Sequence, residues 1–197
     1  MGLFGPPDVS QLKSKKNVKG LIKALSYQKD WRVRELAARA LGELGAVEAV
    51  DALIEKLRDY SEVVENTAAD ALIEIGPPAI DGLVSALADP DRREYVSHVL
   101  VDIGKESIPA LGEVVEKGWF VNARKYAAWT LGKIGDPSGV SALLKGVLDE
   151  DSQVRKAAAK AMLEIGEGAI EPLNDALKND DKKIRQAAEW ALSSFND

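Results

Sequence analysis

The residues of this chain that could carry catalytic chemistry are few and scattered. There is one histidine, His98, and no cysteine, which excludes disulfides and thiolate nucleophiles or metal ligands. No serine lies in a recognisable nucleophile motif, and the Gly-Pro-Pro at 76–78 is a helix terminator, not a phosphate loop. The carboxylates that could act as acids or bases on one helix face are Asp70, Glu94 and Asp102. Solvated helix positions explain them more simply, so we expect no enzyme, no catalytic residue, no metal and no cofactor.

A second set of residues has the chemistry of a binding surface. Aromatic or imidazole side chains recur three residues apart, at Tyr95 and His98 and again at Tyr126 and Trp129. Residues at this spacing share one face of a helix, and aromatic side chains dominate binding hot spots. The segment between them, GWFVNAR (118–124), holds two more aromatic residues. These either contact a partner or fill the gap left by an irregular loop.

The elements that must position these residues form a repeat. A helix that ends in LAARALGELG (36–45) returns in altered form along the chain, and its copies close on Gly45, Gly76, Gly104, Gly135 and Gly166. The spacings are 31, 28, 31 and 31 residues, with Asn196 in the sixth place. A period in this range predicts a helical solenoid, and the short third copy predicts irregular stacking near the middle. Each closing glycine suits a left-handed position after a helix.

Each copy reads as two helices. The first carries apolar residues at i, i+3 and i+7, the pattern of an amphipathic helix, and begins at Val18, Val50, Ile80, Ile108, Val140 and Ile170. An aspartate N-cap for the second helix is expected at Asp30, Asp89, Asp151 and Asp181. In the second helix, positions such as Leu41 repeat with little change, and Ala38 and Gly42 are small enough for close packing between repeats. Strands have no place in this pattern.

The outward positions of the second helix vary from copy to copy. One column of equivalent positions holds Arg39, Asp70, His98, Trp129, Lys160 and Trp190. The column that begins at Glu35, also expected to face water or a partner, supplies Lys125. We expect a partner to bind through Arg39, Tyr95, His98, Lys125, Tyr126, Trp129, Lys160 and Trp190.

The charge distribution restricts the partners. A formal net charge of −6 argues against a nucleic-acid-binding protein, which needs cations to neutralise phosphates. Residues 11–42 are the exception, with nine basic residues against two acidic ones. No apolar run approaches the ~20 residues that span a bilayer. We expect a monomeric cytoplasmic protein with a protein partner and neither a nucleic-acid nor a membrane partner.

The segments DWRVRELAARALGELG (30–45) and DSQVRKAAAKAMLEIG (151–166) resemble HEAT-like repeats of the phycobilisome-lyase type. The resemblance implies an all-α fold: a right-handed α-α superhelix, armadillo-like, of about six two-helix repeats. It places the second helices on a concave binding face. It also implies that an aspartate and an arginine of the loop between the two helices help to form a ladder of contacts between successive repeats. The residues at these two loop positions match here at Asp30/Arg34, Asp89/Arg93, Asp151/Arg155 and Asp181/Arg185.

The expected organisation is an N-terminal segment, 1–16, with a short capping helix, followed by a repeat domain over 17–197. Some HEAT-repeat enzymes bind di-iron through His-Glu pairs, but Val99 follows His98 here. The expected function is a non-enzymatic protein-interaction scaffold. The resemblance leaves open a bilin lyase-like protein that handles a tetrapyrrole on the same aromatic patch. A purely structural, even engineered, array is the third alternative.

Overall fold

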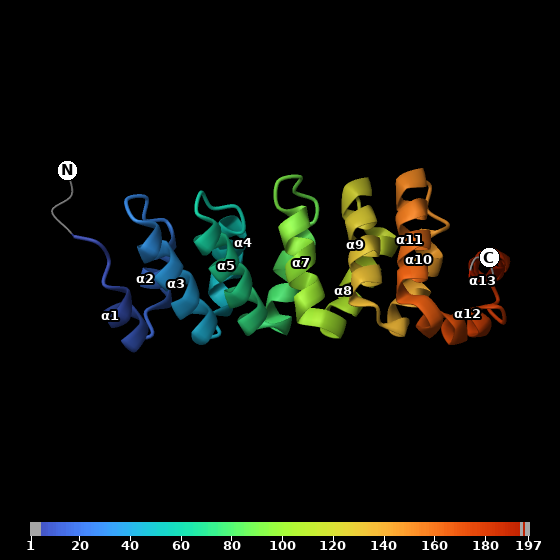
Figure 1. Cartoon of the computed structure of the whole chain (residues 1–197), viewed down its shortest axis with the longest axis horizontal. Coiled ribbons are helices and arrows are strands. Elements are labelled where there is room, and N and C mark those ends of the chain that lie inside the picture. The colour runs from blue at the N-terminus through green and yellow to red at the C-terminus, as the bar shows by residue number, and fades with distance from the viewer. Residues whose placement is uncertain (1–4, 194, 196–197) are drawn as a thin grey trace. The chain divides into compact units, whose positions relative to one another are not determined.

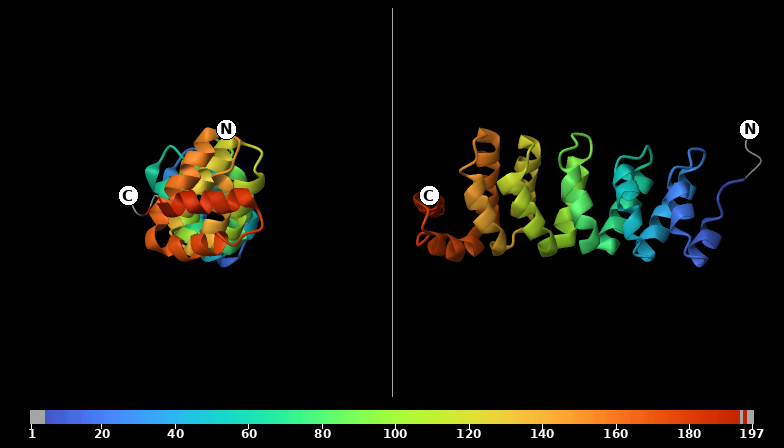
Figure 2. Two further views of the ribbon diagram at one scale, coloured as in Figure 1. Left: turned by 90° about the vertical axis from the view of Figure 1, so that its right-hand side faces the viewer. Right: turned by 180° about the vertical axis from the view of Figure 1, so that it is seen from behind.

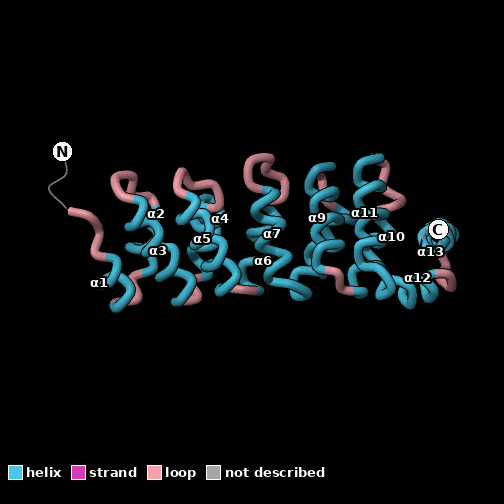
Figure 3. The backbone as a smooth tube through the Cα atoms, in the orientation of Figure 1, coloured by secondary structure: helices cyan, strands magenta, loops and turns pink. Residues whose placement is uncertain are grey.

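The computed structural model describes residues 5–193 and residue 195. Throughout this part of the chain the secondary structure is helical, without a strand (Figure 3). The first helices of the pairs are α2 (Val18–Leu25), α4 (Val50–Lys56), α6 (Ile80–Ala86), α8 (Ile108–Lys117), α10 (Val140–Gly146) and α12 (Ile170–Ala176). The second helices are α3 (Trp31–Glu43), α5 (Glu62–Ile75), α7 (Arg93–Ile103), α9 (Val121–Ile134), α11 (Ser152–Ile165) and α13 (Lys182–Ser193).

The helical pairing predicted from the sequence is confirmed, down to the six starting residues of the first helices. Short 3₁₀ turns lead into five of them: η1 (Val47–Ala49), η2 (Pro77–Ala79), η3 (Gly104–Ser107), η4 (Pro137–Gly139) and η5 (Gly166–Ala169). A further helix, α1 (Val9–Ser14), precedes the pairs, capped by Asp8 and packed on α2 and α3. The fold is an all-α array of two-helix repeats.

The chain divides into two compact units, Met1–Ala86 with α1 to α6 and Leu87–Asp197 with α7 to α13 (Figure 1). The boundary lies inside the short third repeat, just before its tight loop. The expected single repeat domain over 17–197 stays a prediction, and its last repeat end, Asn196, lies outside the described residues.

Within each unit the second helices pack closely, α3 on α5 and α9 on α11. A Cβ added at Gly42 would lie 2.7 Å from the Ala71 Cα, and one at Gly132 would lie 2.7 Å from the Ala161 Cα. Both distances are far too short for real contacts, so only glycine permits this approach. The prediction that Gly42 serves close packing between repeats is confirmed.

The five closing glycines all have positive φ, from 58° at Gly45 to 85° at Gly104. Gly135 adopts the expected left-handed conformation, with ψ 9°. Gly76, Gly104 and Gly166 differ, because their ψ values lie between −137° and −143°. That combination of φ and ψ is close to a region that essentially only glycine occupies. These three positions therefore require glycine more strictly than the left-handed conformation that was expected after each helix.

A buried arginine links neighbouring repeats in each unit. Arg34 Nε and Nη2 donate to the two carboxylate oxygens of Asp59 at 2.9 and 2.5 Å. Arg124 makes the same fork to Asp149 at 2.7 and 3.0 Å. Each acceptor lies 25 residues after its arginine, in the loop of the next repeat.

The predicted Asp–Arg pairs of the ladder are therefore wrong. Arg34 does link to the next repeat, but through Asp59 and not Asp30, whereas Arg155 and Arg185 donate to carbonyls of their own loops. Asp30, Asp151 and Asp181 accept from backbone N–H groups at the starts of α3, α11 and α13, as the predicted N-caps. Asp89 accepts from the Asp91 N–H instead, a turn before α7 begins. The ladder acceptors lie two residues before the N-cap residue of α5 and α11.

In the second unit the last helical pair changes direction. α13 lies across the end of this unit's helices and does not run alongside α11 (Figure 2, left). It buries Ala187, Ala188 and Ala191 and contacts α10 and α12. Residues of α11 and α13 line a cavity beside this turn.

Candidate functional site

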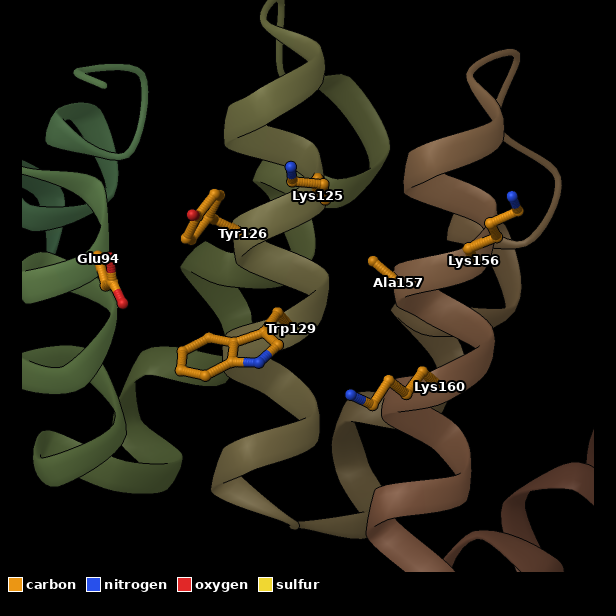
Figure 4. Close-up of a pocket in the computed structure, with 7 residues that line it drawn as sticks. All are labelled: Glu94, Lys125, Tyr126, Trp129, Lys156, Ala157 and Lys160. Carbon is orange, nitrogen blue, oxygen red and sulfur yellow. The ribbon is translucent and has the colours of Figure 1, made fainter. Parts of the chain in front are cut away.

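A groove crosses the second helices of the second unit, with α9 at its centre. It has a volume of about 400 Å³ and is lined by Glu94, Lys125, Tyr126, Trp129, Lys156, Ala157 and Lys160 (Figure 4). Glu94 comes from α7, the next three from α9 and the last three from α11. We call this the central groove.

The floor of the central groove is aromatic. Tyr126 and Trp129 lie one helical turn apart with ring centroids separated by 6.5 Å. The ring centroid of His98, from α7, lies 5.6 Å from that of Trp129 in a T-shaped arrangement, which is a favoured geometry for ring pairs. Tyr126 and Trp129 are half-buried, so these contacts fix their rings while one side of each stays accessible.

Cations surround the same rings. The Arg93 guanidinium carbon lies 5.1 Å from the centroid of the Tyr126 ring, and the Lys125 Nζ lies 5.3 Å from it. Lys133 Nζ lies 5.6 Å from the Trp129 ring. Charges at these distances are attracted to the ring face, so the aromatic floor holds positive charge close to the groove.

The lysines of the groove have few acidic neighbours. Lys160 Nζ lies 3.7 Å from a carboxylate oxygen of Glu164, which also contacts Lys133 at 3.3 Å. Among the described residues, Lys125 and Lys156 have no carboxylate within ion-pair distance. Figure 4 shows the amine of Lys160 directed toward α9, whereas Lys156 extends to the opposite side of α11.

Comparison with known proteins identifies the family. A family model for HEAT repeats matches residues 18–101 and 108–193, most of the chain. The chain belongs to the HEAT-repeat family. A curated relative, phycocyanobilin lyase subunit alpha of Picosynechococcus sp., is 34% identical over 84 residues, which cover 38% of this chain and 31% of that subunit. The chain thus matches about a third of the length of this relative, and the HEAT-like repeats of phycobilisome-lyase type predicted from the sequence are confirmed.

Solved structures with similar repeats include human deoxyhypusine hydroxylase in complex with glycerol, at 21% identity and a TM-score of 0.41, covering 95% of this chain and 76% of that one. The CpcE–CpcF complex of phycocyanin lyase from Nostoc sp. PCC7120 has 22% identity and a TM-score of 0.38, covering 94% and 85%. The HEAT-like repeats protein of Thermococcus onnurineus NA1 has 16% identity and a TM-score of 0.40, covering 95% and 90%.

The HEAT-repeat chain brings together four of the eight predicted binding residues. Lys125, Tyr126, Trp129 and Lys160 line the central groove. His98 is exposed on α7 and joins them through its ring contact with Trp129. The other three predicted residues do not line this groove.

Tyr95 and Trp190 are exposed, at 43% and 52%, on α7 and α13. Arg39 lies in the first unit, where its Nη2 donates to the Glu35 carboxylate at 2.5 Å. Glu35 was expected to face water or a partner, but it is buried within the protein. Because Arg39 pairs with it, the buried carboxylate keeps a counter-charge.

The sequence interpretation missed Glu94, Lys156 and Ala157 as groove residues. Glu94 and Lys156 occupy the same repeat column as Lys125, so applying the column rule to all copies would have found them. Ala157 occupies the same repeat column as Tyr126, so the rule places it on this face as well, although the type of its side chain gave no sign of binding.

Trp119 and Phe120 do not fill a gap. They stand 94% and 63% exposed on the loop before α9, so the gap-filling interpretation is wrong. Arg124 occupies the loop interior instead, donating from Nη1 to the Gly118 carbonyl at 2.8 Å.

In the described part of the chain, no group of three or more His, Asp or Glu side chains is arranged so that it could hold a metal ion. Nor does any described helix combine the length and apolar character that crossing a membrane requires.

Proposed function

We propose that this HEAT-repeat protein is a non-catalytic interaction scaffold that binds a protein partner through the central groove. The observation that carries the proposal is the groove itself, where Tyr126 and Trp129 form a half-buried aromatic floor among cations. Rigid aromatic side chains in a water-excluding recess are typical anchors of protein interfaces. A packed helix-on-helix scaffold holds them without a loop that must reorder.

The proposal also includes predicted contact residues that do not line the central groove. Tyr95 and His98 extend the surface on α7, and Arg39 is a separate contact on the first unit. A concave shape of this face, a monomeric state and a cytoplasmic location remain predictions. No nucleic-acid or membrane partner is proposed.

Partner capture with two matched double variants tests the proposal. Tyr126→Ala/Trp129→Ala removes the aromatic floor, whereas Trp119→Ala/Phe120→Ala removes comparable aromatic surface from the exposed loop. We expect the groove variant to lose captured partners and the loop variant to retain them, with unchanged circular dichroism for both. Identical partner sets for wild type and the groove variant would contradict the proposal.

A second candidate function is the handling of a tetrapyrrole in the same groove. The favouring observation is the 34% identity to a phycocyanobilin lyase subunit, together with a recess of small-molecule size. Titration with free phycocyanobilin, followed by visible absorption, tests it. Saturable spectral change that is lost in Tyr126→Ala/Trp129→Ala would favour this candidate, and an unchanged pigment spectrum would eliminate it.

A further inference from the structure

A second cavity lies on the other side of α11 from the central groove. It has a volume of about 530 Å³ and opens where α13 turns across the stack. The lining residues that matter are Leu148, Arg155, Lys156, Lys183, Ala187 and Trp190. We call it the terminal groove. Lys156 lines both grooves, so together they form one surface that crosses α9, α11 and α13.

The charge of this surface is opposite to that of the chain. Five cationic residues line the two grooves, against the single carboxylate of Glu94: they are Lys125, Arg155, Lys156, Lys160 and Lys183. The chain as a whole has a formal net charge of −6. A local excess of cations on an acidic protein attracts and orients an acidic partner.

These cations are available to a partner. In the described structure, Lys125, Lys156 and Lys183 have no carboxylate within ion-pair distance. Arg155 uses its Nη1 for the carbonyls of its own loop, Asp149 at 2.9 Å and Glu150 at 2.8 Å. A carboxylate of a partner can therefore pair with these lysines without breaking an existing ion pair.

Each end of the surface has an aromatic side chain. Trp129 and Tyr126 form the floor of the central groove, and Trp190, 52% exposed, contributes to the terminal groove. The two aromatic sites lie on α9 and α13, with α11 between them. Because α11, a helix about 10–12 Å across with its side chains, separates the two grooves, one compact small molecule fits one groove. A chain of roughly six extended residues, at about 3.3 Å each, is long enough to cross α11 and reach both.

Building on the proposed function, we propose that the partner presents an acidic polypeptide segment across α9, α11 and α13. One apolar side chain of the segment enters the central groove and another enters the terminal groove. Carboxylates between them face Lys156 and its neighbours. This names the chemistry of the partner, which the proposed function leaves open.

Selection from a random peptide library displayed on phage tests the inference, with the 197-residue chain as bait. We expect the enriched peptides to be acidic and to carry two separated apolar residues. Synthetic copies should bind about three- to tenfold more weakly to Lys156→Glu and more weakly at high salt. Lys105→Glu is the matched control, since it makes the same charge change on the η3 turn, outside both grooves.

The outcomes separate this inference from the proposed function. Neutral or basic peptides that require Tyr126 and Trp129 would overturn the acidic partner and leave the protein-binding groove intact. Acidic peptides that bind Tyr126→Ala/Trp129→Ala as well as wild type would overturn the proposed function. Equal weakening by Lys156→Glu and Lys105→Glu, tighter binding of single-stranded oligonucleotide than of peptide, or no enriched peptide would each overturn the inference.

Discussion

At the scale of single residues, the Arg124–Asp149 pair shows how one repeat holds the next. Both side chains are 9% exposed, and the arginine also binds the Gly118 carbonyl of its own loop. Asp149 in turn accepts from the Asp151 N–H at 2.8 Å. Every charge in this cluster is partnered, so removing one member leaves the other buried without compensation.

Arg124→Ala should therefore destabilise the protein by about 3 kcal/mol, since it strands the Asp149 carboxylate. The control is Arg155→Ala, because Arg155 is exposed, donates its hydrogen bonds to carbonyls of its own loop and reaches the Asp149 carboxylate only through a weaker electrostatic attraction. We expect that change to cost less than about 1 kcal/mol. Urea unfolding followed by circular dichroism measures both, and equal losses would contradict the role of the buried pair.

The same pairs predict the response to acid. Burial by itself would raise the pKa of Asp149, but hydrogen bonds from Arg124 and the Asp151 N–H outweigh it and hold that pKa below its usual range. Asp59 has a lowered pKa for the same reasons, with burial opposed by Arg34, Ser61 and Lys56.

A carboxylate with a lowered pKa stabilises the fold fully above its unfolded value, about 3.9 for aspartate, and loses this effect as pH falls through the folded-state pKa. Asp149→Asn should thus make the free energy of unfolding less dependent on pH below about pH 4. Urea unfolding at a series of acidic pH values tests this. A variant whose stability falls as steeply as that of wild type would show that Asp149 is not responsible.

Glu65 is the opposite case. It stands where other repeats carry the ladder arginine, and burial, Glu62 and Asp59 raise its pKa. The fold therefore favours the protonated form of Glu65. The stability that this form contributes is lost as pH rises through the raised pKa and the carboxylate ionises. Glu65→Gln should increase stability at neutral pH by a few tenths of a kcal/mol and show no gain in acid. A loss of stability at pH 7 would refute this reasoning.

At the scale of elements, the approach of α9 to α11 depends on Gly132. An alanine there would place its Cβ 2.7 Å from the Ala161 backbone, so the helices would have to separate. We expect Gly132→Ala to lower the melting temperature, although alanine favours a helix by about 1 kcal/mol over glycine. Gly139→Ala is the control, because its nearest neighbour is Leu131 at 3.4 Å, an ordinary contact. A higher melting temperature for Gly132→Ala would contradict the close approach.

The elements were predictable from the sequence because their signals are local and repeated. The i, i+3, i+7 pattern located the first helices, and the closing glycines located the ends of most second helices. The ladder was not predictable in detail, because Arg34 and Asp59 are separated by a helix and two loops. The burial of Glu35 was missed for a similar reason, since its phase on α3 does not report which neighbour covers it.

The candidate site was predictable in part. The column rule identified Lys125, Trp129 and Lys160, because outward phase depends only on helical period. It could not reveal the terminal groove, which exists because α13 turns away from the direction of α11 (Figure 2). Such a change of direction depends on packing among several helices, and no single helix encodes it.

At the scale of the whole molecule, contacts gather within two units. Segments with many mutual contacts unfold cooperatively, so native-state hydrogen exchange should show two sets of amides. We expect α2 to α5 to share one opening free energy and α8 to α11 to share another, with weaker protection in residues 87–92. A single free energy across all of these helices would contradict this division.

The arginine fork also sets a rule for rearranging the repeats. Each fork points forward along the chain, from one loop to an acidic residue supplied by the following copy. A duplicated or transplanted repeat could follow the repeat of Arg34 or Arg124 only if it supplied an acidic residue at the position of Asp59 or Asp149. Good packing of its leucines and alanines would not be enough. The arginine–aspartate pair between successive repeats therefore restricts which repeats can be exchanged and in which order. Matching hydrophobic faces alone do not make two copies interchangeable.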